Sequence, residues 1–137
     1  MSNPAEQPQQ GVPGAAIVRY TVGESDTRPW GHWEVIATGE RYTAKRITVL
    51  PGQRLSLQYH HHRQEHWTMV EGRAEVEIDG TVSQLGFADH VHIKLGAVHR
   101  IRNPGPETLV FVEVQLGDLL DENDIVRVSD DYGRQGA

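Results

Sequence analysis

The sequence predicts an all-β domain, a sandwich or barrel built from short strands. Its short apolar segments are separated by turn signals at close intervals, which is typical of that architecture. We find no convincing helical periodicity along the chain. With 137 residues, the chain can form one hydrophobic core but not two. We therefore expect a single domain at 15–137, preceded by a disordered or extended arm at 1–14, which is rich in Pro, Gln and Gly.

The first strands can be placed from a turn signal. Pro51-Gly52 indicates a turn between a strand near 42–50 and one near 54–60. Side chains alternate between the two faces of a strand, and Lys45 has the same parity as the apolar positions Ile47 and Val49. We therefore expect the Lys45 ammonium group to point inward, near the mouth of a cavity.

The clearest strand signal lies at 73–78, where apolar and charged residues alternate strictly. Asp79-Gly80 follows it directly. This dipeptide favours a two-residue hairpin turn of type I′, so we expect the next strand at 81–85.

A long apolar strand is expected near the C-terminus. The residues 103–106, Asn-Pro-Gly-Pro, separate a strand near 98–102 from the apolar run 108–116. A continuous apolar run is typical of a strand that is buried on both faces. In a small barrel a partner would have to cover the second face, so we expect a homodimer.

Four side chains have the spacing of a metal site. Gln58 and His60 share one face of their strand, Glu65 follows a short polar break, and His99 begins a later strand. Two imidazoles, one carboxylate and one amide suit a divalent transition metal ion. Zinc is our first choice, and manganese, iron, cobalt or nickel would accept the same donors. His62 is the substitute ligand, since His60 and His62 could form the pair instead.

Bulk composition excludes several partners. The net charge is −6, which gives no electrostatic reason to expect nucleic acid or an anionic membrane. No apolar run approaches the length of a membrane span and no signal peptide is evident, so we expect a cytoplasmic protein. Cysteine is absent, which excludes disulfides and thiolate ligands.

Two signatures resemble those of the cupins. The first has matching spacing, with an amide where a histidine is usual: Gly52, Gln58, His60, Glu65 and Gly72. The second is met by Gly96, His99 and Asn103, although Lys94 stands where a proline is usual. The resemblance implies a single cupin domain, a double-stranded β-helix or jelly-roll-type barrel. A Gln-His-Glu-His set also resembles the metal site of type I phosphomannose isomerases, which supports Gln58 as a ligand.

A narrower resemblance covers most of the chain. The segments at 28–35, 45–58, 60–67, 112–115, 124–127 and 131–134 are similar to type II mannose-6-phosphate isomerases. In that family this domain is usually the C-terminal part of a bifunctional enzyme, behind a mannose-1-phosphate guanylyltransferase. Because the similarity begins at residue 28, we expect a stand-alone domain. The resemblance implies metal-dependent interconversion of mannose 6-phosphate and fructose 6-phosphate through a cis-enediol, in carbohydrate metabolism and polysaccharide biosynthesis.

The reaction requires a proton shuttle and a cation for the phosphate. Glu113 and Gln115 share a face of the long strand, and a carboxylate inside a barrel is costly unless it is paired or functional. Glu113 is therefore the candidate base, with pairing to an arginine as the structural alternative, and Gln115 is a candidate substrate contact. The expected substrate is a small phosphorylated sugar or another small carbonyl compound. Lys45 and Arg63 are the candidates for holding the phosphate of such a sugar.

A second class of function remains open, because fold alone does not decide chemistry. The domain could be a non-catalytic sugar-binding cupin or a small metal-dependent oxygenase. Lys45 and Arg63 favour the phosphorylated sugar over an oxygenase. Among the other histidines, we expect His61 to point away from the metal and His66 to orient a ligand.

Overall fold

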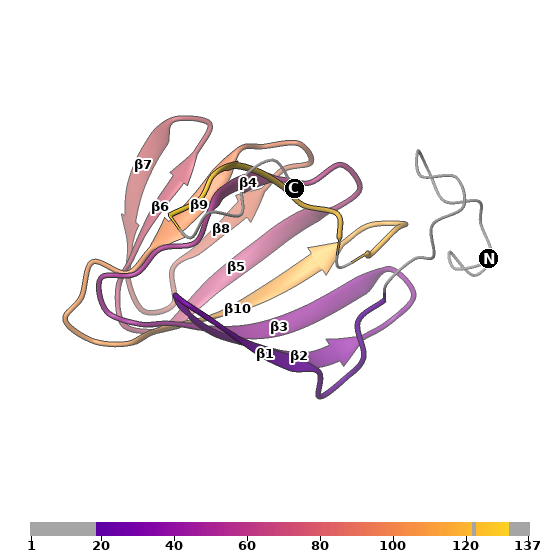
Figure 1. The fold of residues 1–137 in the computed structure, drawn as a ribbon, viewed down its shortest axis with the longest axis horizontal. Helices are drawn as coiled ribbons and strands as arrows, with labels where there is room; N and C mark the ends of the chain where they lie inside the picture. Colours follow the sequence, from indigo (N-terminus) through magenta and orange to yellow (C-terminus); the bar gives the residue numbers. More distant parts are fainter. Residues whose placement is uncertain (1–18, 122, 132–137) are drawn as a thin grey trace.

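The computed structural model describes residues 19–121 and 123–131, which form strands and no helix (Figure 1). One antiparallel sheet has six strands, in the order β1 (Ser25–Arg28), β2 (Gly31–Thr38), β3 (Tyr42–Val49), β10 (Leu109–Leu116), β5 (Gln64–Glu71), β8 (His90–Ile93). The other has five, in the order β11 (Val126–Ser129), β4 (Leu57–Tyr59), β9 (His99–Arg102), β6 (Ala74–Ile78), β7 (Thr81–Leu85). Over this part of the chain, no helix is long and apolar enough to cross a membrane.

The structure confirms most of the strands expected from the sequence. Strands β3, β6, β7, β9 and β10 lie where the alternation and the turn signals place them. The strand expected at 54–60 is shorter, because Arg54 makes only an isolated bridge to Arg102 before the regular pairing of β4 begins at Leu57. The arm expected at 1–14 lies outside the described residues.

The hairpin between β6 and β7 confirms the turn expected at Asp79-Gly80. Both residues have positive φ angles, 47° at Asp79 and 86° at Gly80. Positive φ at both central residues defines a type I′ turn, whose twist matches that of the flanking strands.

The two sheets face each other in Figure 1, and β10 shows how the apolar core passes into a polar interior. Leu109 and Phe111 on its inner face belong to the hydrophobic core. Glu113 and Gln115 continue the same face and are also buried, with 6% and 0% of their surface exposed. The barrel therefore has an apolar half and a half in which charged and amide groups are enclosed.

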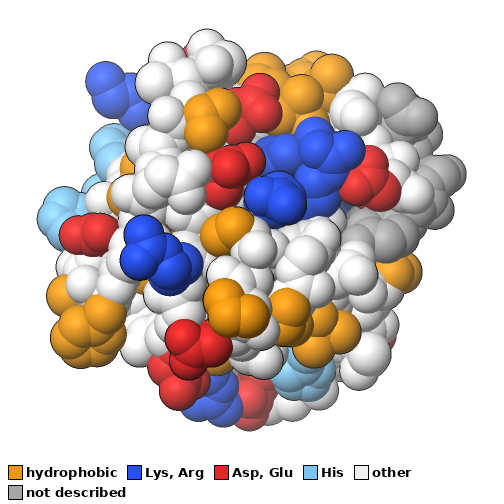
Figure 2. All heavy atoms as spheres, turned by 90° about the vertical axis from the view of Figure 1, so that its left-hand side faces the viewer, with side chains coloured by type: hydrophobic (Ala, Val, Ile, Leu, Met, Phe, Trp, Pro, Cys, Tyr) orange, Lys and Arg blue, Asp and Glu red, His pale blue; other side chains and the backbone are white. Residues whose placement is uncertain are grey.

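The outer surface carries charges of both signs. Figure 2 shows lysine and arginine side chains bordered by acidic ones on one face of the molecule. Exposed ion pairs link Arg54 to Asp131 and Arg46 to Glu34. The exterior of the described residues thus carries paired charges of both signs.

Candidate metal centre and its cavity

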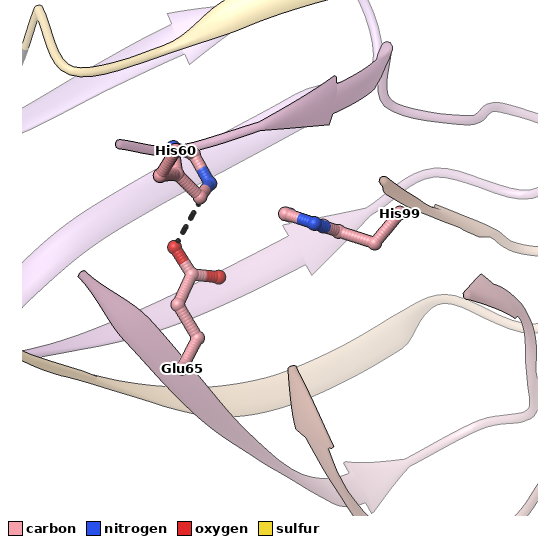
Figure 3. A group of neighbouring side chains, drawn as sticks. All are labelled: His60, Glu65 and His99. Atoms are coloured by element: carbon pink, nitrogen blue, oxygen red, sulfur yellow. Dashed lines mark ion pairs between the residues drawn. The ribbon is translucent and has the colours of Figure 1, made fainter. Parts of the chain in front are cut away.

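His60, Glu65 and His99 converge inside the barrel (Figure 3). One possible ligand atom from each lies within 4.8 Å of the others, and all three side chains are buried. His60 follows the end of β4, Glu65 lies in β5 and His99 begins β9, so both sheets contribute. His60 Nε2 lies 3.2 Å from Glu65 Oε2.

Backbone carbonyls fix the orientation of both histidines. His60 Nδ1 lies 2.6 Å from the carbonyl oxygen of Asp124, and His99 Nδ1 lies 2.8 Å from that of Ala97. A carbonyl oxygen can only accept a hydrogen bond, so each Nδ1 carries a proton and Nε2 is the ring nitrogen left for a metal ion. Burial lowers the pKa of His99 to about 4, which keeps its ring neutral near pH 7. The neutral His99 imidazole therefore fits a transition metal ion.

Gln58 lies next to His99, one of the three candidate ligands. It pairs directly with His99 across β4 and β9, and its side chain lines the same cavity. The amide nitrogen donates to Ser56 Oγ at 3.2 Å and more weakly to the Ser56 carbonyl. Its carbonyl oxygen is then the atom available to a metal ion. The four-ligand set remains a prediction, which this geometry suits.

Two side chains hold the Glu65 carboxylate. Trp67 Nε1 donates to Oε1 at 2.9 Å, and Arg63 Nε donates to Oε2 at 2.8 Å. Burial alone would raise the pKa of Glu65, but the charge of the Arg63 guanidinium outweighs it and holds that pKa well below its usual range. Glu65 is therefore an anion in the folded protein, as a ligand to a cation should be.

The three other histidines between residues 60 and 66 lie outside the candidate metal site. His61 is exposed, and His62 is half-buried and does not line the cavity. His66 was expected to orient a ligand, and this is wrong. It lies on the outer face of β5, where its ring stacks on His92 across the strand pair with centroids 4.2 Å apart. Parity explains this result, since Glu65 points inward and its neighbour must point outward.

Glu113 lines the cavity, and its neighbours favour the protonated form of its carboxyl group. Burial and the negative charge of Glu65 raise its pKa to about 8, while the Lys45 ammonium works in the other direction. Gln115 Nε2 donates to Glu113 Oε2 at 2.9 Å. Gln115 itself does not line the cavity. The structure thus places Gln115 behind Glu113, as a residue that holds the carboxyl group.

Lys45 and Arg63 both point into the cavity and have partners there. The Lys45 Nζ lies 3.8 Å from the ring centroid of Tyr20 and 4.3 Å from that of Trp33, so two aromatic faces stabilise its charge. Arg63 is 6% exposed, and its Nη1 is buried with no hydrogen-bond partner among the described residues. A buried donor without an acceptor is costly, so Nη1 is poised for an oxygen atom supplied from the cavity.

The cavity encloses about 770 Å³, which includes the solvent at its mouth. Two carboxyl groups line it, Glu65 and Glu113, against five cationic side chains: Arg28, Lys45, Arg63, Arg100 and Arg127. The sequence analysis did not identify Arg28, Arg100 or Arg127 as cavity residues. The cavity is therefore basic inside an acidic chain, which favours an anionic ligand.

Comparison with known proteins identifies the family. Residues 19–130 match the family model described as "Mannose-6-phosphate isomerase C-terminal", so the chain belongs to that family. It is 51% identical over 107 residues to the mannose-1-phosphate guanylyltransferase of Escherichia coli K12, covering 78% of this chain and 22% of that protein. It is also 51% identical over 107 residues to the xanthan biosynthesis protein XanB of Xanthomonas campestris strain B100, covering 78% and 23%. The chain thus spans about a quarter of the length of these relatives.

Solved structures agree on the fold. A Klebsiella pneumoniae protein with a double-stranded β-helix domain matches with a TM-score of 0.63 and 27% identity, over 82% of this chain and 86% of that one. The two antiparallel sheets and this similarity confirm the all-β cupin fold expected from the sequence. The His60, Glu65 and His99 cluster is accordingly the candidate metal site of a cupin domain of the mannose-6-phosphate isomerase family.

Proposed function

We propose that this domain isomerises mannose 6-phosphate and fructose 6-phosphate in a metal-dependent reaction. The observation that carries the proposal is the position of Glu113, a protonatable carboxyl group in the same basic cavity as the candidate ligands. The family match and the enzyme names of the relatives support an enzyme of this class. Gln58, His60, Glu65 and His99 would hold a divalent ion, zinc first.

The residues suggest how a proton would move. The bound ion would polarise the sugar carbonyl and the neighbouring hydroxyl group. The Glu113 carboxylate would take the proton from C2 of mannose 6-phosphate, which leaves a cis-enediolate. A proton would then pass from O2 to O1 through the cis-enediol, and Glu113 would deliver a proton to C1 to form fructose 6-phosphate. A pKa raised to about 8 suits a group that must both take and give a proton near neutral pH. Gln115 would hold the carboxyl group in place through its hydrogen bond.

The basic lining supports an anionic substrate. Arg63 Nη1 is a donor without a partner in the cavity, and the Lys45 ammonium lies close enough to lower the pKa of Glu113. Arg28 and Arg127 contribute further positive charge from β1 and β11. We keep Lys45 and Arg63 as the residues that hold the phosphate, and we add Arg28 and Arg127 as charges that attract it.

Solvent exchange tests the proposal directly. In D₂O, the metal-loaded wild type should replace the C2 proton of mannose 6-phosphate with deuterium. Proton NMR measures this exchange as the loss of the C2 proton signal. Glu113→Gln keeps the shape and a hydrogen-bond acceptor but removes the base, so the exchange rate should fall by roughly 10²–10⁴-fold. Metal content should be unchanged, since Glu113 is not a proposed ligand.

The control is Glu71→Gln, which changes an exposed carboxylate at the end of β5. It should leave the exchange rate at the wild-type value. If the metal-loaded wild type exchanges no C2 proton, the isomerase proposal fails.

A further inference from the structure

Asp124 joins the C-terminal segment to the candidate metal centre through three hydrogen bonds. Its backbone carbonyl accepts from His60 Nδ1 at 2.6 Å. Its carboxylate accepts from two consecutive backbone N–H groups, that of His61 through Oδ1 at 2.8 Å and that of His62 through Oδ2 at 2.9 Å. One residue therefore contacts every residue from 60 to 62, although it lies more than sixty positions away in the chain.

These contacts satisfy groups that the sheets leave out. His61 and His62 lie in a bend between the end of β4 and the start of β5, so no strand ladder pairs their N–H groups. Asp124 is only 7% exposed, so its charge in turn needs the two donors. The bend and the carboxylate thus depend on each other.

We propose that Asp124 is a positioning residue for the metal centre, which sets both the place and the tautomer of His60. A partner on the non-ligating nitrogen fixes which ring nitrogen faces the metal. Here that partner is the Asp124 carbonyl, and the Asp124 side chain keeps the carbonyl in place by anchoring to the bend. This inference rests on the candidate metal site and is independent of the isomerase reaction.

The same residue also connects the metal centre to the cavity wall. Ile125 and Arg127 follow Asp124 directly in the chain and line the cavity. Strand β11 begins at Val126, and Val126 pairs with Tyr59, next to His60. Displacing Asp124 would therefore move a candidate ligand and a basic wall of the cavity together.

Metal affinity tests the proposal. Asp124→Ala removes both side-chain acceptors and Asp124→Asn removes one. Zinc affinity, measured by chelator competition, should therefore fall further in Asp124→Ala than in Asp124→Asn. We expect about a 10–100-fold loss for Asp124→Ala, the range found when such outer partners are removed. Asp118→Asn is the matched control, since Asp118 lies in the same connection and forms an exposed pair with Arg41. It should bind zinc as the wild type does.

A second readout separates positioning from a general loss of stability. In the metal-free protein, nitrogen NMR of the histidine rings should show His60 protonated at Nδ1 in the wild type and in Asp118→Asn. The same spectrum should show mixed tautomers in Asp124→Ala. A folded Asp124→Ala with wild-type zinc affinity and an unchanged His60 tautomer would overturn the proposal. If Asp124→Ala does not fold, Asp124→Asn decides, and wild-type values of both measurements in that variant would overturn it.

Discussion

Glu65 and Glu113 are the same type of residue in one cavity, yet their surroundings push their pKa values apart. Glu65 receives hydrogen bonds from Arg63 and Trp67, and its pKa is held well below the usual range. Glu113 receives one hydrogen bond, from the neutral Gln115, and burial beside Glu65 raises its pKa to about 8. One carboxyl group is therefore kept as an anion for a cation, and the other is kept able to exchange a proton.

The raised pKa of Glu113 predicts how metal-free stability depends on pH. The folded chain keeps this proton up to about pH 8, whereas a carboxyl group with the ordinary value loses it near 4.5. The folded state binds the additional proton in that window, so this group makes the free energy of unfolding fall as the pH rises through it. In Glu113→Gln this loss should be absent. Urea denaturation with a chelator present measures the free energy of unfolding of both proteins. Between pH 5 and pH 8, the value for Glu113→Gln should rise relative to that of the wild type by at least about 1 kcal/mol.

Glu71→Gln again serves as the control for this measurement, because Glu71 is exposed. Its stability should follow the wild-type pH profile. A Glu113→Gln profile parallel to that of the wild type would show that Glu113 does not carry the raised pKa.

Alternation along the strands made the direction of several site residues predictable, whereas the direction of side chains in loops could not be predicted. The inward direction of Lys45, Glu113 and Gln115 followed from alternation along β3 and β10, and burial confirms it. The pairing of Arg63 with Glu65 could not be predicted, since Arg63 lies in the bend before β5, where no period fixes side-chain direction. Asp124 belongs to a segment that resembles the family, but its contacts to the bend depend on tertiary structure alone.

At the scale of the elements, the two glycines that flank the first cupin signature are needed for different physical reasons. Gly52 and Gly72 both have left-handed φ angles, 78° and 77°. A Cβ on Gly52 would meet nothing within 4 Å, whereas one on Gly72 would lie 2.5 Å from the backbone oxygen of Thr108. Gly52 is thus needed for the turn, and Gly72 is needed for the turn and for the close approach of β10.

This difference gives a matched pair of variants. Gly52→Ala should cost about 1–2 kcal/mol, the strain of a left-handed residue with a side chain. Gly72→Ala should cost more, by roughly a further 1–3 kcal/mol, since a backbone oxygen cannot move aside as a flexible side chain would. The free energy of unfolding from urea titration measures both. Equal losses in the two variants would contradict the clash at Thr108.

Some strands could not be placed from the sequence. Strand β1 has the sequence Ser-Asp-Thr-Arg and no buried position, so it lacks the alternation that marks a half-buried strand. Strand β8 is a four-residue edge strand with only Ile93 buried. Both form because a neighbouring strand offers free backbone groups, which is a property of the sheet and not of the local sequence.

For the whole molecule, the apolar run 108–116 has a consequence for assembly. Strand β10 lies between β3 and β5, so its backbone is already paired on both sides and can join a second chain only through its outer face. That face presents four half-buried apolar side chains, Val110, Val112, Val114 and Leu116. Arg46 and Thr68 lie beside Val112 on the neighbouring strands. The apolar strip is therefore narrow and framed by polar groups, as the centre of an interface is by its rim.

The homodimer remains a prediction, and the outer face of β10 is where we expect it to form. The wild type should sediment at micromolar concentration as two chains of 15.4 kDa. Val112→Glu should shift the mass to one chain, because it would bring two like charges into the apolar centre of the interface. In the single chain the carboxylate would lie in water beside Arg46. Val22→Glu changes a residue that is 58% exposed outside both sheets, and it should leave the mass unchanged. A single-chain mass for the wild type would mean that the barrel tolerates this apolar strip in water, and the twofold assembly would then have to be abandoned.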